Sequence, residues 1–236
     1  MTILLRSIDG WGYRMRLFVA AVLAGFGLTL LAPIPAHAQP MDCPPNCDRI
    51  PSSAWIAPTS IPLYDVYRWP ELAGLSVTAV NPRFRFEEVC DTPAAAQDPR
   101  LWAVSARSTA TSPDGQWHLQ AQVIHWRGET WRGGQTAIGV FDAALAELRR
   151  CQLTAPFTSP SVTTAEPDRF AAVLSSPDRS VLRQYLLVDP NNSTLTELAM
   201  WTTDAPPQVP WPAARDGAVL DALAAPLCTA YIGSCR

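Results

Sequence analysis

The sequence predicts an α+β domain with an antiparallel sheet of about five to six strands and two helices on one face. Three observations lead to this prediction: short segments that alternate apolar and polar residues, turn tetrads between them, and two helical patterns that follow groups of strands. Runs of neighbouring strands, separate from the helices, are typical of this class. The composition agrees, because 48% hydrophobic and 17% charged residues are globular values.

An N-terminal signal peptide is expected over residues 1–38. Leu17–Leu31 is an apolar run that follows two arginines, and Ala36–Ala38 has the A-x-A form of a cleavage site. The run is shorter than the roughly 20 apolar residues that a membrane span needs. An uncleaved anchor is the alternative, and membrane contact is expected only through this segment. Met15 offers a second start position.

The chain from Gln39 to Arg236 carries little that would attract nucleic acid. The sequence has 18 basic residues, all Arg, against 21 acidic residues; removing three Arg and one Asp with the signal peptide moves the net charge from −3 to −5. Phosphate backbones require clustered Lys or Arg, and no such cluster is present. We therefore expect a secreted or cell-envelope protein that does not bind nucleic acid.

Six cysteines lie beyond the signal peptide: Cys43, Cys47, Cys90, Cys151, Cys228 and Cys235. An even number in an exported chain predicts disulfides, and their spacing fits no zinc pattern, so no metal or other cofactor is predicted. Short loops favour Cys43–Cys47 and Cys228–Cys235 among the 15 full pairings, which leaves Cys90–Cys151. A Cys47–Cys90 or Cys151–Cys228 bridge would contradict this assignment.

Residues 39–74 form a Pro-rich arm, in which frequent prolines exclude a long helix or a central strand. A single α+β domain is expected over residues 75–236. Four aromatic residues could pack the arm onto this domain: Trp55, Tyr64, Tyr67 and Trp69. After the arm, Phe84 and Phe86 alternate as in a short strand, and we place the neighbouring Glu87 and Glu88 on a solvated edge.

A β-hairpin is predicted from Leu101–Ala110 and Gln116–Trp126, joined by a Ser-Pro-Asp-Gly turn. In its second strand, Leu119, Ala121 and Val123 face one way while Gln120 and Gln122 face the other. This alternation is typical of a sheet that is covered on one face only.

An amphipathic helix is predicted from Thr136, as N-cap, to Cys151. Its apolar face contains residues in steps of three and four: Ile138, Phe141, Leu145 and Leu148. Gly139 costs such a helix about 1 kcal/mol relative to Ala.

Three further strands are predicted at Phe170–Leu174, Val181–Val188 and Thr194–Thr202, after a loop at Pro156–Pro167. A last helix should start near Asp216, bury Val219, Leu220 and Leu223, and end at Pro226. Two similar segments, SPDGQWHLQAQVI and SPDRSVLRQYLLV, lie 64 residues apart. Shared turn chemistry explains this similarity, with duplication as the alternative.

No catalytic residue is predicted. His118 and His125 are seven residues apart on one strand, so they point to opposite faces and cannot bind one metal ion. The sequence lacks local motifs such as G-x-S-x-G, the P-loop and H-E-x-x-H. A Ser-His-Asp site assembled from distant residues is the alternative.

The most suggestive binding motif is a pair of W-R-G units in the loop before the central helix. It contains Trp126, Arg127, Trp131 and Arg132, which could stack sugar rings or hold an anionic head group. The alternative is that both indoles cover the core and the glycines make turns.

Three segments, QAQVIHW, TAIGVFDAALAELRRC and VLRQYLLVD, resemble the extracellular sensor domains of mycobacterial PknH-type Ser/Thr kinases and their secreted or lipoprotein relatives. The resemblance covers roughly residues 100–235. It implies an antiparallel sheet with two helices, disulfides that pin helix to sheet, and sensing without catalysis. The sequence departs from this family in having no kinase domain and in its arm with Cys43 and Cys47.

These observations lead us to expect a secreted, non-enzymatic cell-envelope protein of an actinobacterium, acting as a ligand-binding, sensor-like or accessory module. Its partner would be an envelope lipid or glycan, or an envelope protein. The alternatives are an exported hydrolase and a structural envelope protein that binds a protein partner. A pocket with His, Ser and Asp would favour the hydrolase, an apolar cleft would favour ligand binding, and an exposed aromatic arm would favour a protein partner.

Overall fold

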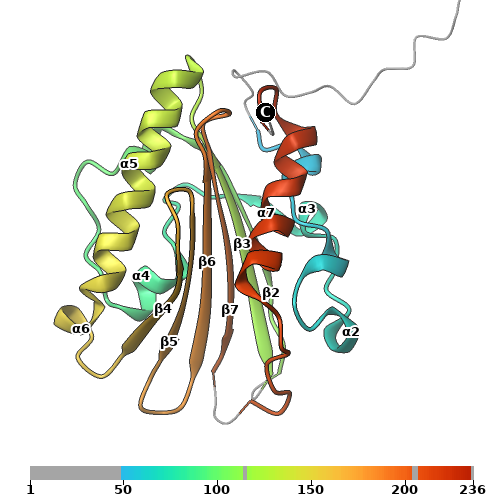
Figure 1. The fold of residues 1–236 in the computed structure, drawn as a ribbon, viewed down its shortest axis with the longest axis vertical. Helices are drawn as coiled ribbons and strands as arrows, with labels where there is room; N and C mark the ends of the chain where they lie inside the picture. Colours follow the sequence, from blue (N-terminus) through green and yellow to red (C-terminus); the bar gives the residue numbers. More distant parts are fainter. Residues whose placement is uncertain (1–48, 114–115, 204–206, 235–236) are drawn as a thin grey trace, which may run out of the picture. The chain divides into compact units, whose positions relative to one another are not determined.

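Seven strands form one sheet in the computed structural model, which describes residues 49–113, 116–203 and 207–234 (Figure 1). The strand order is β1-β2-β3-β7-β6-β5-β4, and all neighbours are antiparallel. The antiparallel α+β fold is thus confirmed, with seven strands where five to six were expected. The strands are β1 (Val77–Thr78), β2 (Val104–Ala110), β3 (Trp117–His125), β4 (Ser159–Ala165), β5 (Arg169–Ser175), β6 (Val181–Asp189) and β7 (Thr194–Thr202).

The helices differ in length from a few residues to twenty. They are α2 (Tyr64–Tyr67), α3 (Leu72–Leu75), α4 (Arg85–Val89), α5 (Thr130–Arg149), α6 (Cys151–Thr154) and α7 (Asp216–Ala230), with the 3-10 helices η1 (Ser52–Ala54), η2 (Pro58–Ser60) and η3 (Pro99–Trp102). All described residues belong to one compact unit, Asp42–Arg236. The expected signal peptide at residues 1–38 lies outside the described residues.

Two strand predictions were wrong. The segment expected as a loop at Pro156–Pro167 contains β4, the outermost strand, where Pro160 is tolerated because an edge strand has one unpaired side. Phe84 and Phe86, expected in a strand, flank the start of α4 instead. The Glu87 carboxylate accepts the backbone N–H of Phe84 at 2.6 Å, which caps this helix and turns the chain.

The prediction that both helices cover one face was also wrong, because α5 and α7 lie on opposite faces of the sheet (Figure 1). Strand β5 shows this alternation. Phe170 and Ala172 pack in the same core cluster as α5, whereas Ala171 packs in the cluster of α7. Strands β5 to β7 are apolar on both sides, so each face needs its own cover.

Strand β3 is consequently buried along its whole length. Gln120 and Gln122, which the sequence suggested would face solvent, lie on the α5 side and are 4% and 0% exposed. Their amides form hydrogen bonds inside the protein, which makes burial of these polar groups tolerable. The alternation of side chains along β3 was predicted correctly, but the burial of its polar side was not.

The arm and α7 together fill the second face. Trp55, Ile61 and Trp69 pack in one cluster with Trp117 of β3 and Leu220 of α7, and Trp69 Nε1 donates to the Pro62 carbonyl oxygen at 2.8 Å. The α7 helix continues through Pro226 to Ala230 rather than ending at the proline. Its predicted buried residues Val219, Leu220 and Leu223 are confirmed.

Helix α5 begins at Thr130, so the second W-R-G unit is helical rather than part of a loop. Its two glycines, Gly133 and Gly134, allow a close approach to the turn between β6 and β7. A Cβ at Gly133 would lie 2.5 Å from Ser193 Oγ, and one at Gly134 would lie 2.3 Å from the Pro190 carbonyl oxygen. These glycines therefore seat the helix on the sheet.

A disulfide joins Cys90, which follows α4, to Cys151, which follows α5, with 4.9 Å between their Cα atoms. This confirms the predicted long-range bridge, and both cysteines are fully buried. The pairings expected for Cys43, Cys47 and Cys235 lie outside the described residues. In the part of the chain with described coordinates, no helix is long and apolar enough to cross a membrane.

Candidate ligand-binding site

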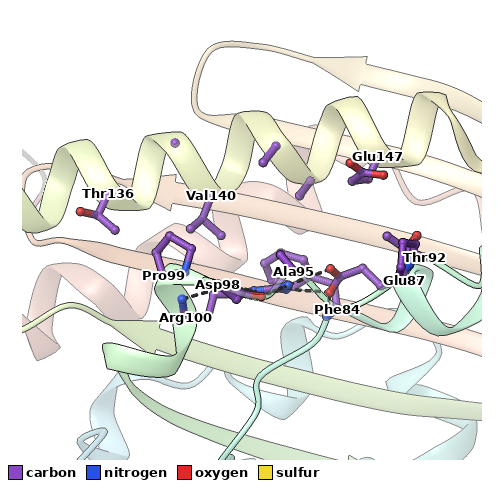
Figure 2. A pocket seen from close by; sticks show the side chains of 14 residues that line it. Phe84, Glu87, Thr92, Ala95, Asp98, Pro99, Arg100, Thr136, Val140 and Glu147 are labelled. Carbon is purple, nitrogen blue, oxygen red and sulfur yellow. Dashed lines mark hydrogen bonds and ion pairs between the residues drawn. The ribbon is translucent and has the colours of Figure 1, made fainter.

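A groove of about 500 Å³ runs between α5 and the segment from Phe84 to Arg100. This volume lies in the range of about 300–1,000 Å³ that is common for small-molecule sites. The α5 wall consists of Thr136, Gly139, Val140, Ala143, Ala144 and Glu147. The opposite wall consists of Phe84, Glu87, Thr92, Pro93, Ala95, Asp98, Pro99 and Arg100. Figure 2 shows the two walls facing each other, with Val140 above Pro99.

The α5 wall is one face of the helix, because its residues recur in steps of three and four from Thr136 to Glu147. Most of them are small. A Cβ at Gly139 would meet no heavy atom within 4 Å, so packing does not require glycine at this position. Since Gly in a helix costs about 1 kcal/mol relative to Ala, this residue leaves space in the groove at a cost in stability.

Three links hold the second wall against α5. The Cys90–Cys151 disulfide joins the two walls covalently at one end. Thr154 donates its hydroxyl hydrogen to the Cys90 carbonyl oxygen near the same end. Farther along, Trp126 Nε1 donates to the Pro99 carbonyl oxygen at 3.0 Å. The groove is thus bounded by a wall that is fixed at both ends.

A buried ionic cluster forms the polar part of the second wall (Figure 2). Arg100 donates to both carboxylate oxygens of Glu87, at 2.6 and 2.8 Å, and to Asp98 Oδ2 at 2.6 Å. The side chains of Arg100, Glu87 and Asp98 are 9%, 8% and 11% exposed. The predicted solvated edge at Glu87 and Glu88 was therefore wrong for Glu87, while Glu88 is exposed and pairs with Arg85.

Asp98 and Arg100 of this cluster are arranged to stay charged. Burial alone would raise the pKa of Asp98, but hydrogen bonds from Arg100 outweigh it and hold this pKa below its ordinary value. Burial likewise opposes the charge of Arg100, yet the hydrogen bonds to Glu87 and Asp98 raise its pKa. The Arg100 guanidinium also lies 4.7 Å from the centre of the Phe84 ring. The cluster stiffens the wall from Phe84 to Arg100.

A second buried carboxylate, Glu197 of β7, holds the start of α4 against the sheet. Its Oε1 accepts the Arg85 backbone N–H at 2.6 Å and Gln184 Nε2 at 2.9 Å, and its Oε2 accepts Gln120 Nε2 at 3.1 Å. Burial raises the pKa of Glu197 to about 7, against the opposing effect of these hydrogen bonds. The groove wall therefore rests on a group that titrates near neutral pH.

The two similar sequence segments meet at this point. Gln120 of β3 and Gln184 of β6 both lie opposite Ala199 of β7, one on each side of that strand. Both amides donate to Glu197, and Gln184 Oε1 also accepts the Phe86 backbone N–H at 3.2 Å. The shared glutamine thus has the same role in both segments.

The four residues of the W-R-G motif do not form a single surface. Trp126 is only 6% exposed and packs in the α5 core, as the alternative for this motif expected. Trp131 is 59% exposed, and Arg132 lies 4.9 Å from its ring centre while pairing with Glu129 at 3.1 Å. Arg127 is exposed. A binding surface at this position would have to use Arg127, Trp131 and Arg132 without Trp126.

The two histidines lie on opposite sides of β3, as the sequence predicted. His118 stacks on Trp201, with ring centres 5.5 Å apart, and its Nδ1 accepts the Ser112 backbone N–H. His125 stacks on Tyr231, and its Nδ1 is 3.0 Å from the Thr194 hydroxyl oxygen. Neither histidine lines the groove. Within residues 49–113, 116–203 and 207–234, no group of three potential ligands from His, Cys, Asp or Glu could hold a metal ion.

Sequence reasoning missed Asp98, Arg100 and Glu197. Asp98 lies in Pro93–Pro99, which reads as a surface loop, and Arg100 directly follows it. No spacing rule connects either residue to Glu87. Glu197 did leave a signal, because it is the only charged residue in the strand Thr194–Thr202. A lone acid in an apolar strand indicates a buried carboxylate with dedicated donors.

Comparison with known proteins identifies no family for this chain. No family model, no curated protein and no solved structure matches the chain. The candidate site is therefore defined by the residues of the groove, the ionic cluster beside it and the carboxylate beneath it.

Proposed function

We propose that this protein is a non-enzymatic ligand-binding module of the cell envelope, sensor-like or accessory in role, and that the groove beside α5 is its ligand site. The observation that carries the proposal is the groove itself. It has the volume of a small-molecule site, a stiff wall, and a glycine that leaves one side of the helix bare.

The lining of the groove supports binding rather than hydrolysis. A hydrolytic site of the Ser-His-Asp type needs a base within hydrogen-bond reach of a nucleophile. The groove contains Asp98, but this carboxylate is engaged by Arg100, and both histidines lie elsewhere. An aromatic protein-binding arm is also less favoured, because Trp55 and Trp69 are 7% and 4% exposed.

The long disulfide fits an exported protein, because such bonds persist in oxidising compartments. The proposal of an envelope location rests on this bond together with the signal peptide expected from the sequence. The similarity to PknH-type sensor domains points to the same kind of role.

Native mass spectrometry of the protein purified from its own host tests the proposed function. We expect a retained small molecule that is displaced in Gly139→Leu, because this side chain would occupy the groove. Gly217→Leu is the matched control. Gly217 is also an exposed helical glycine with no heavy atom within 4 Å of its Cβ position, but it lies on α7.

Both substitutions should raise the melting temperature slightly, because Leu is a better helix former than Gly by up to about 1 kcal/mol. Only Gly139→Leu should lose the ligand. Equal ligand retention in both variants, with both proteins folded, would contradict the assignment of the groove.

A further inference from the structure

We propose that the groove binds the hydrocarbon chain of a lipid, extended along α5, and that it recognises the chain rather than the charge of the head group. This inference rests on the proposed function and adds the chemical class of the ligand. It follows from the charges, the polar groups and the length of the groove.

Each charged side chain that lines the groove is paired with another side chain of the protein. Glu87 and Asp98 share Arg100, and Glu147 pairs with Arg150 at 2.6 Å. A charged head group inside the groove would have to compete with these pairs. The apolar lining, by contrast, offers Val140, Ala143 and Ala144 without competition. The groove is therefore suited to an uncharged part of a ligand.

The same lining disfavours a glycan or a peptide. Sugar rings stack on exposed aromatic faces, but Phe84 is fully buried and the Arg100 guanidinium lies over its ring. A peptide would bring backbone N–H and C=O groups that require partners. The carboxylates and the guanidinium beside the groove already bond to each other. A hydrocarbon chain makes no such demand.

The length of the α5 wall fits a chain of moderate size. From Thr136 to Glu147 the helix advances about 16 Å at about 1.5 Å per residue. Carbon–carbon bonds of about 1.52 Å with angles near 111° advance about 1.25 Å per atom along an extended chain. The wall therefore accommodates a chain of about 13 carbons.

Titration calorimetry at pH 7 with three twelve-carbon probes tests the inference: 1-dodecanol below its solubility limit, and dodecanoate and dodecyltrimethylammonium below their micelle concentrations. We expect dissociation constants within about threefold of one another. Each buried methylene removed should weaken binding about fourfold. The eight-carbon analogues should therefore bind on the order of 250-fold more weakly, and Gly139→Leu should abolish binding while Gly217→Leu keeps it.

A preference of more than tenfold for one head group would overturn the inference, because it would show an ionic subsite. Affinity that does not depend on chain length, or no binding of any alkyl probe, would overturn it as well. The proposed function fails separately. If the host-purified protein carries another ligand that Gly139→Leu displaces, the groove remains a ligand site and only its assignment to hydrocarbon chains falls.

Discussion

The two faces of the sheet are covered in different ways. On the α7 face, a helix and the Pro-rich arm pack over Trp117, Tyr185 and Met200 in one continuous apolar cluster. On the α5 face, the helix covers only part of the surface. The rest lies beneath α4 and the segment to Arg100, which carry buried charges and leave the groove. One face is filled by apolar packing, whereas the other combines packing with buried ion pairs and open space.

This difference suggests that the α7 face mainly provides stability, whereas the α5 face carries the binding groove. An apolar cluster tolerates little change, because each removed methylene leaves a cavity. The α5 face instead depends on a few polar links that can be broken one at a time. Paired substitutions on the two faces therefore test whether the groove side is specialised for binding.

The largest effect is expected for Arg100→Leu. Removing the guanidinium leaves Glu87 and Asp98 buried without their counter-ion, which should cost about 3–5 kcal/mol of unfolding free energy. Urea unfolding measures this change. The control on the α7 face is Arg183→Leu, which removes a guanidinium 4.3 Å from the Trp211 ring centre and should cost only about 0.5–1 kcal/mol.

Adding Glu87→Gln and Asp98→Asn to Arg100→Leu should recover part of the lost stability, since the stranded charges are then removed. Equal losses for Arg100→Leu and Arg183→Leu would contradict the distinction between the faces.

Loss of the Cys90–Cys151 disulfide should come next. The cysteines are 61 residues apart in sequence, for which the chain-entropy model gives about 4 kcal/mol. Cys90→Ser with Cys151→Ser should lower secretion and melting temperature strongly and should also weaken ligand retention. Cys43→Ser, in the short bridge predicted outside the described residues, should cost about 2 kcal/mol. A larger loss for Cys43→Ser than for the double variant would argue against this ranking.

The pH dependence of stability should change in Glu197→Gln. In the folded protein the pKa of Glu197 is about 7, whereas the ordinary pKa of this side chain is 4.5. As the pH rises between these values, the unfolded chain releases its proton first. This group therefore lowers the unfolding free energy by roughly 3 kcal/mol from pH 4.5 to pH 7. The stability that it provides is fully present below pH 4.5 and is lost as the pH rises through 7.

Urea unfolding of wild type and Glu197→Gln at pH 5 and pH 7.5 measures this contribution as a difference. The unfolding free energy of Glu197→Gln should rise relative to that of the wild type as the pH rises. Parallel pH profiles for the two proteins would show that Glu197 does not titrate in this window.

The smallest effect is expected for two tryptophans with matching bonds. Trp126 Nε1 donates to the Pro99 carbonyl oxygen, and Trp117 Nε1 donates to the Val209 carbonyl oxygen on the α7 face. Replacing either with Phe should cost about 1 kcal/mol for the lost hydrogen bond, plus the cost of the cavity that the smaller ring leaves. Only Trp126→Phe should change ligand affinity, because only Pro99 lines the groove. Equal ligand affinity in both variants would show that Trp126 does not contribute to ligand binding.

The sequence allowed prediction of those elements whose pattern reflects local geometry. The β2–β3 hairpin, strands β5 to β7, helix α5 and the Cys90–Cys151 bridge all follow from alternation, helical spacing or cysteine arithmetic. The α5 face was partly misjudged, since Ile138 is 37% exposed while Val140 and the glycines Gly133 and Gly134 are buried. Small residues contribute little to a hydrophobic pattern even where they define the contact.

The groove could not be predicted in the same way. Its second wall depends on Glu87 and Arg100, which are 13 residues apart in a segment without periodicity. Buried polar residues such as Gln120 resemble solvent-facing residues in any sequence pattern, because their partners come from distant strands. The sequence also does not show which face of the sheet each helix covers, because both sides of β5 to β7 are apolar.

The edge strand β4 has a consequence for how the protein avoids aggregation. An edge strand of seven residues without a charged side chain could pair with the edge of another copy and start aggregation. Pro160 removes one backbone donor from this edge, and the register shift between Val162 and Thr164 interrupts its regular hydrogen-bond spacing. The opposite edge, β1, is only two residues long. Both edges of the sheet are therefore poor templates for a neighbouring chain, which disfavours edge-to-edge association between copies.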